Sequence, residues 1–156
     1  MQRLETPAQF NRAHQQMVAL LPLRAFVLVA AADGAIDRRE IRQGLRGLEE
    51  LADTTVVGAA ALEHLQTAPF GEVLEELASE TPAAHGAALM VVGAVLDEAL
   101  GARAVQEKRA VVRYARSVAE ASGGWFGFGA KADDSQEAVL GMISVALRVP
   151  GLQVHD

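Results

Sequence analysis

The chain has 156 residues, of which 51% are apolar, and it carries a formal net charge of −6. This length and apolar content suit one domain with a sizeable core, and the composition excludes a disordered or fibrous protein. Cysteine is absent, which excludes disulfide frameworks, thiolate metal sites and thiol nucleophiles and fits a reducing cytoplasm.

Apolar residues recur at helical spacing along nearly the whole chain, and aromatic and threonine residues are too few for a chain of strands. We expect an all-α, single-domain bundle of about seven to eight helices over residues 1–156. A first helix opens at Thr6 and Pro7 and ends at Pro22, because proline removes a helical hydrogen bond. A second helix, apolar on every face and therefore central, covers about residues 23–32.

Capping residues, prolines and glycines bound the remaining helices. Asp37 and Glu40 have capping-box spacing and begin a third helix, which ends near Asp53. Further helices are expected at about residues 55–66, 69–79, 82–100, 104–121 and 134–149. Gly101 marks the break before the charged helix of the second half of the chain.

Charges are distributed unevenly along the sequence. No lysine or arginine occurs between Arg46 and Arg103, whereas that interval contains ten acidic residues. The remainder holds 14 basic and 10 acidic residues, a balance of +4. This asymmetry argues against nucleic-acid binding over most of the surface and permits a local basic face beside an acidic one.

No catalytic constellation is recognisable, and we expect no enzymatic activity. The four histidines are far apart in sequence, and no serine has a nucleophile-elbow context. The first sixteen residues are polar, and the longest uncharged apolar run, residues 87–96, is about half a membrane span. We therefore expect a cytoplasmic protein without a secretory signal.

Two parts of the chain match at an offset of 67 residues. Residues 26–52 and 93–119 each read as an apolar helix, a glycine break and a charged helix. The matched pairs include Gly34 and Gly101, Glu40 and Glu107, Arg42 and Arg109, and Arg46 and Arg113. We interpret residues 17–53 and 82–122 as the approximate limits of two pseudo-symmetric repeats.

The stretch FVLVAAADGAIDRREIRQ resembles the signature of the TerB-like family, the helical domains named for bacterial tellurite resistance. That signature is an alanine-rich helix, then Asp-Gly, a small residue, an aliphatic one, and a glutamate seven residues after the aspartate. The matching residues are Asp33, Gly34, Ile36, Asp37 and Glu40. In the second half, Leu100 and Ala104 stand opposite the two aspartates, which departs from a complete second acidic cluster.

The resemblance implies two helical hairpins and a non-catalytic role in stress response or membrane-linked signalling through protein partners. It also implies a divalent cation held near the helix breaks by Asp33, Asp37 and Glu40, with Glu107 as the fourth ligand. Oxygen ligands favour magnesium, calcium or manganese. The residues leave an alternative open, a metal-independent helical interaction module in which the same acids are helix caps.

Arginines at four-residue steps form two basic stripes. The stripes consist of Arg38, Arg42 and Arg46, and of Arg109, Arg113 and Arg116. Arg42, Arg46, Arg109 and Arg113 are the repeat-matched members and the expected contacts for an acidic partner or an anionic membrane surface. The alternative is that the stripes are solvated faces that stabilise their own helices. We expect no nucleic acid as partner, and a homodimer is left open.

Overall fold

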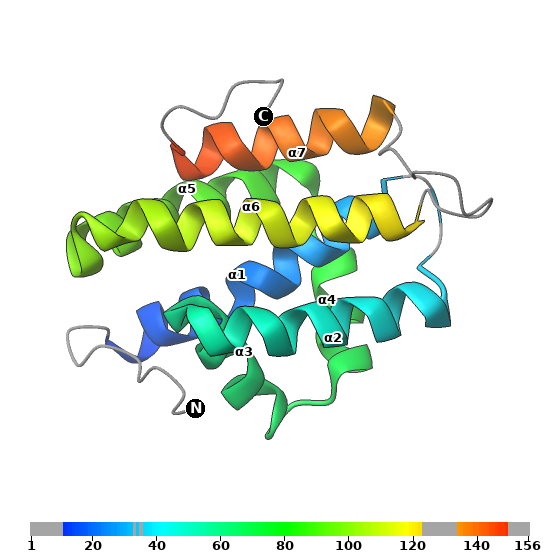
Figure 1. Cartoon of the computed structure of the whole chain (residues 1–156), viewed down its shortest axis with the longest axis horizontal. Coiled ribbons are helices and arrows are strands. Elements are labelled where there is room, and N and C mark those ends of the chain that lie inside the picture. The colour runs from blue at the N-terminus through cyan, green and yellow to red at the C-terminus, as the bar shows by residue number, and fades with distance from the viewer. Residues whose placement is uncertain (1–10, 33, 35, 123–133, 150–156) are drawn as a thin grey trace.

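The computed structural model of the chain describes residues 11–32, 34, 36–122 and 134–149. In these ranges the protein consists of seven α-helices without a β-strand (Figure 1). The helices are α1 (Arg12–Ala30), α2 (Arg38–Thr54), α3 (Val56–Leu65), α4 (Phe70–Ala78), α5 (Pro82–Leu100), α6 (Arg103–Ser122) and α7 (Asp134–Leu147). The expectation of an all-α bundle is confirmed.

Helix α1 lies at the centre of the bundle. In Figure 1, α2 and α3 lie below α1, and α5, α6 and α7 lie above it. α1 packs against α3, α4, α5, α6 and α7, and its side chains Val18, Leu23 and Phe26 are completely buried. A helix surrounded in this way needs apolar residues on every face, which explains the apolar sequence between Val18 and Ala30.

The predicted break at Pro22 is wrong, because α1 continues through this proline as one helix. An interior proline removes one backbone hydrogen bond and costs about 3 kcal/mol. The neighbours Leu21, Leu23 and Phe26 are at most 1% exposed, and burying each such side chain contributes about 1.5–3 kcal/mol. Tertiary burial therefore outweighs the local penalty.

The start of α1 also differs from the expectation. Asn11 caps the helix, and its side-chain oxygen accepts a hydrogen bond from the backbone N–H of His14 at 2.9 Å. The predicted start at Thr6 and Pro7 lies outside the described residues. The limits predicted for α3, α4 and α5 agree with the structure within one or two residues, since each of these helices begins at a threonine or proline signal.

One buried polar cluster ties α1 to the start of α5. The Arg24 guanidinium donates to Oε1 of Glu80 at 2.6 Å and to Nδ1 of His85 at 2.9 Å. Burial and the nearby Arg24 charge lower the pKa of His85, with burial the larger cause. An arginine has no acceptor, so His85 accepts this bond on Nδ1 in its neutral form.

Glycines let α2 approach its neighbours closely. A Cβ at Gly44 would collide with the ring of Phe26 in α1, and one at Gly47 would lie 3.0 Å from the ring of Tyr114 in α6. The hydroxyl of Tyr114 also donates to the carbonyl oxygen of Gly44 at 2.9 Å. The small residues of α2 thus set how closely it packs on α1 and α6.

Replacement of Gly44 by alanine should destabilise the protein by about 1–3 kcal/mol, because the added methyl group overpacks the contact with Phe26. Urea unfolding followed by circular dichroism measures this loss. Gly141→Ala in α7 is the matched control, since no atom lies within 4 Å of its Cβ position; there we expect a gain of about 0.5–1 kcal/mol from helix propensity. Equal effects of the two substitutions would contradict the close contact.

Candidate functional site

Two of the predicted cation ligands form the cap of α2. Oδ1 of Asp37 accepts a hydrogen bond from the backbone N–H of Glu40 at 2.7 Å, and Oε2 of Glu40 accepts one from the N–H of Asp37 at 3.0 Å. This reciprocal pair is a complete capping box. The structure therefore brings Asp37 and Glu40 together, as helix caps, while Asp33 lies outside the described residues.

Glu107, the predicted fourth ligand, caps a different helix. Its carboxylate is buried, with the residue 2% exposed, and accepts a hydrogen bond from the backbone N–H of Val57 at 3.0 Å. Val57 follows the C-terminal end of α2, whereas Asp37 precedes its N-terminal end. The 17 residues of α2 span about 25 Å at 1.5 Å per residue. The structure thus separates Glu107 from Asp37 and Glu40 by far more than one ion can bridge.

The chemistry of Glu107 is that of a buried cap. Burial raises the pKa of its carboxyl group, and the N–H groups of Val57 and Val56 oppose this rise by stabilising the charged form. The carboxylate also lies at the positive end of the α3 dipole. Across the described ranges, no three histidine, aspartate or glutamate side chains gather closely enough to hold a metal ion.

The Glu107 carboxyl should give the stability a specific pH dependence. A raised pKa means that the folded protein binds more protons, so this contribution is present below about pH 4.5 and is lost as pH rises through the raised pKa. Glu107→Gln keeps an acceptor oxygen but cannot titrate, so wild type should lose stability relative to this variant between pH 4 and 7, as measured by urea unfolding.

Glu107→Ala serves as the companion variant. It leaves the buried N–H of Val57 without its acceptor, and we expect it to be about 1–3 kcal/mol less stable than Glu107→Gln at every pH in this range. A difference between wild type and Glu107→Gln that does not change with pH would show that the carboxyl does not titrate in this window.

The predicted basic residues are on the surface of two adjacent helices. Arg42 and Arg46 are exposed on α2, Arg109 and Arg113 are exposed on α6, and the two helices pack together. In Figure 1 they run antiparallel across the front of the bundle. Within the described part of the chain, Arg42 and Arg46 form no ion pair.

The exposed face of α2 changes sign along its length. Its first half carries Arg38, Arg39, Arg42 and Arg46, and its second half carries Glu49, Glu50 and Asp53. The helix dipole favours the opposite order, with acids near the N-terminus and bases near the C-terminus. Apart from the capping residues Asp37 and Glu40, the charge order of α2 is therefore unfavourable with respect to its helix dipole.

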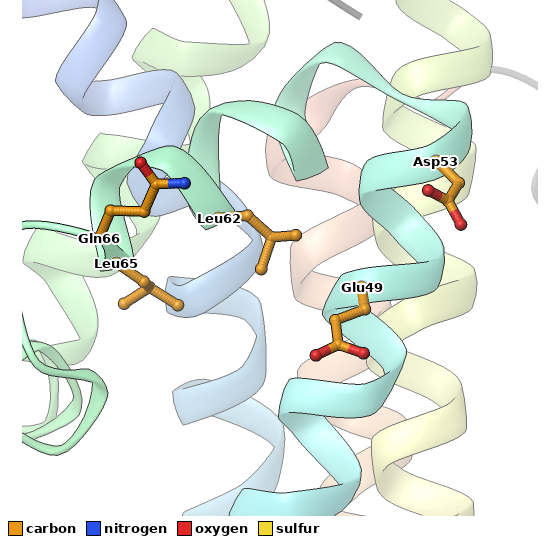
Figure 2. Close-up of a pocket in the computed structure, with 5 residues that line it drawn as sticks. All are labelled: Glu49, Asp53, Leu62, Leu65 and Gln66. Carbon is orange, nitrogen blue, oxygen red and sulfur yellow. The ribbon is translucent and has the colours of Figure 1, made fainter. Parts of the chain in front are cut away.

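A cleft of about 420 Å³ lies between α2 and α3 at the acidic end of this face. Its lining consists of Glu49 and Asp53 of α2, and of Leu62, Leu65 and Gln66 in and after α3. Figure 2 shows the acidic side chains on one side of the gap and the leucines on the other. Both leucines are partly buried against the core, whereas both acids are exposed.

Sequence reasoning did not find this cleft. In the sequence, Glu49 and Asp53 belong to the acidic interval, and Asp53 marks the expected end of the third helix; their four-residue spacing places them on one side of α2. Neither acid forms an ion pair with any residue that the structure describes. The cleft thus offers two carboxylates that pair with no described residue, opposite an apolar wall.

A second, larger cleft of about 800 Å³ lies between α1 and α3. It is lined by Arg12, Gln15, Gln16, Ala19, Ala60, Glu63, His64 and Thr67. Its charged groups are of both signs, so it favours neither an anionic nor a cationic ligand. The α2–α3 cleft has the more defined chemistry.

Comparison with known proteins gives no relative: no family model, curated protein or solved structure matches the chain. The TerB-like resemblance therefore depends on the signature residues alone.

By length and hydropathy, α1 and α5 are the two described helices that could cross a membrane. In α1 that property follows from its central position in the core.

Proposed function

We propose that this protein is a non-catalytic, metal-independent helical interaction module that binds a basic and partly apolar segment of a partner protein in the α2–α3 cleft. The observation that supports this proposal is the pairing of two exposed carboxylates, Glu49 and Asp53, with the apolar wall formed by Leu62 and Leu65. Lysine and arginine side chains match such a surface, because their apolar stems pack on leucine while their charged ends reach the carboxylates.

The size and charge of the cleft agree with this ligand. A volume of about 420 Å³ is at the small end of ligand pockets and suits one or two large side chains of a partner segment. The acids of the cleft belong to the interval between Arg46 and Arg103, which contains no lysine or arginine. No lysine or arginine of this interval competes with a basic partner segment, and the nearest basic residue along α2 is Arg46, one turn before Glu49.

The basic half of α2 extends the proposed surface. Arg42 and Arg46 lie on the same exposed face as the cleft acids, so a partner segment with acidic residues beside its basic ones would complement both halves. Arg109 and Arg113 on α6 add a further contact for acidic partners or anionic headgroups. We place the protein in the cytoplasm on sequence grounds, with peripheral contact at the inner membrane face as an extension of this surface.

A TerB-like arrangement with a divalent cation is the second candidate, and it would connect the protein to stress response. Two observations favour it. Gly34 and Gly101, the glycines matched in the repeat, both have positive φ angles, of 137° and 56°. Asp37 and Glu40 also bring two carboxylates to one turn. The capping box is the reason for preferring the metal-independent proposal, since each carboxylate already serves the α2 backbone.

A basic amphipathic probe peptide should bind the cleft. The suggested probe is a helical 14-residue peptide of leucine, lysine and alanine, with a glutamate-for-lysine peptide as comparison, and fluorescence anisotropy gives the affinities. The double variant Glu49→Gln with Asp53→Asn should weaken binding about tenfold, because each exposed ion pair contributes up to about 1 kcal/mol.

The matched control is Glu72→Gln with Glu75→Gln on α4, which removes the same net charge at two exposed positions outside the cleft. We expect it to change the affinity less than about twofold, because distant exposed charges are screened by salt. Equal losses for the two double variants, or NMR shift changes that avoid Leu62 and Leu65, would refute the cleft as the binding site.

Calorimetric titration with calcium or magnesium should give no saturable heat, and the thermal midpoint should not change with millimolar ion. The reason is that Asp37 and Glu40 are engaged in the α2 cap. Asp33→Asn combined with Glu40→Gln is the informative variant. A saturable heat in wild type that is lost in this variant would establish the cation site instead.

A further inference from the structure

Within the part of the chain that the structure describes, no element covers one apolar face of helix α5. The exposed residues of this face are Ala83, Ala84, Ala87, Met90, Val91 and Ala94. Met90 is 56% exposed and Val91 is 45% exposed, and with the neighbouring alanines they form an exposed apolar patch. Steps of three and four residues place the set on one side of the helix. In the most apolar 18-residue segment of α5, only 33% is buried, compared with 61% in the corresponding segment of α1.

The charges at the end of this face disfavour an anionic surface as its occupant. Asp97 and Glu98 follow the apolar stripe in the last turn of α5, and both are exposed. Asp97 is paired with the buried Lys108 at 2.7 Å, whereas Glu98 has no ion pair with any described residue. These two acids at the end of the α5 face repel anionic headgroups locally.

The order of residues along the face makes it complementary to itself. We propose that a second copy of this chain covers it, with the two α5 helices antiparallel across a twofold axis between Met90 and Val91. In this register Met90 meets Val91 of the second copy, Ala87 meets Ala94, and Ala83 meets Glu98. Large side chains thus fill the centre, and small ones on either side allow the helices to approach closely.

Charge complementarity supports the antiparallel direction. Each Glu98 carboxylate reaches the first turn of the other α5, where the helix dipole presents its positive end. The α5 N-terminus begins at the Thr81 cap and carries no acidic residue in its first turn. A parallel pairing would instead place the two Glu98 carboxylates side by side.

This dimer should be weak and reversible. A single helix pair buries on the order of 1,000 Å² in total, the lower limit for a specific interface, so we expect a dissociation constant in the micromolar range.

The inference does not depend on the proposed peptide site, because α2 and α3 lie on the opposite side of α1 from α5 in Figure 1. Failure of one proposal therefore leaves the other unaffected.

A pair of charged substitutions at the centre of the face tests the register. Sedimentation velocity on the full chain at increasing concentration measures the association of each variant. Met90→Glu alone and Val91→Lys alone should each weaken association at least tenfold, since each places an uncompensated charge at the centre. The two substitutions together should restore association to within about threefold of wild type, because each new carboxylate then faces the new ammonium group of the other copy. Within one chain, adjacent helical positions do not face each other.

Disulfide trapping gives an independent readout, because the chain has no cysteine of its own. A mixture of the Ala87→Cys and Ala94→Cys variants should form a linked dimer on oxidation. Ala87→Cys alone should not, since its two copies would be about 10 Å apart along the helices, beyond disulfide reach. Val145→Cys on α7, at a residue 78% exposed, is the control for random collision.

Three results would overturn the proposal. The first is a monomer at every concentration, and the second is cross-linking of the Val145→Cys control as fast as that of the mixed pair. The third is binding to phosphatidylcholine vesicles that Met90→Glu abolishes while the protein in solution stays monomeric, which would assign the face to a neutral lipid surface. Circular dichroism of each variant confirms the fold, since all substituted positions are exposed.

Discussion

Burial of α1 on all sides is the constraint on which the arrangement of the other helices depends. Because its apolar side chains point in every direction, helices must cover it from both sides, and α3, α4, α5, α6 and α7 all contact it. The same burial holds Pro22 inside a continuous helix. Burial also requires that the charge of Arg24 has partners. Glu80 and His85 accept its hydrogen bonds, so the charge is tolerated in this position.

The parts of the fold that could be predicted from the sequence are those with local signals. Asp37 and Glu40 begin α2 through contacts three residues apart, and Thr81 with Pro82 begins α5 in the same way. Pro22 failed as a local signal because long-range packing outweighed it.

The functional site was harder to predict than the helices, because its contacts join residues that are far apart in the sequence. Glu107 bonds to a backbone group 50 positions away, and no spacing rule reveals such a partner. The α2–α3 cleft likewise exists only once the two helices are packed together.

The surface of α2 shows a division between stability and recognition. Its capping box and its close contacts through Gly44 hold the helix in place, whereas its exposed charges run against the helix dipole. Exposed charges such as Arg42 and Glu49, which form no ion pair with any described residue, are available to a partner. The proposed cleft and the α5 face lie on opposite sides of α1, so a dimer would present two clefts that point away from the shared helices. Such an arrangement would bind two partner segments, or one long one, with increased avidity.

The central position of α1 has a consequence for synthesis. Ala30 ends α1, and α6, one of its main neighbours, begins at Arg103, so the 72 residues 31–102 must be added before α6 begins. At about 5–20 residues per second, the ribosome needs several seconds for this interval. During that time α3, α4 and α5 are added, but the side of α1 that α6 and α7 cover still lacks its neighbours. Rapid translation between α1 and α6 would shorten the time for which this apolar side of α1 stays exposed, and would thereby favour correct folding over aggregation.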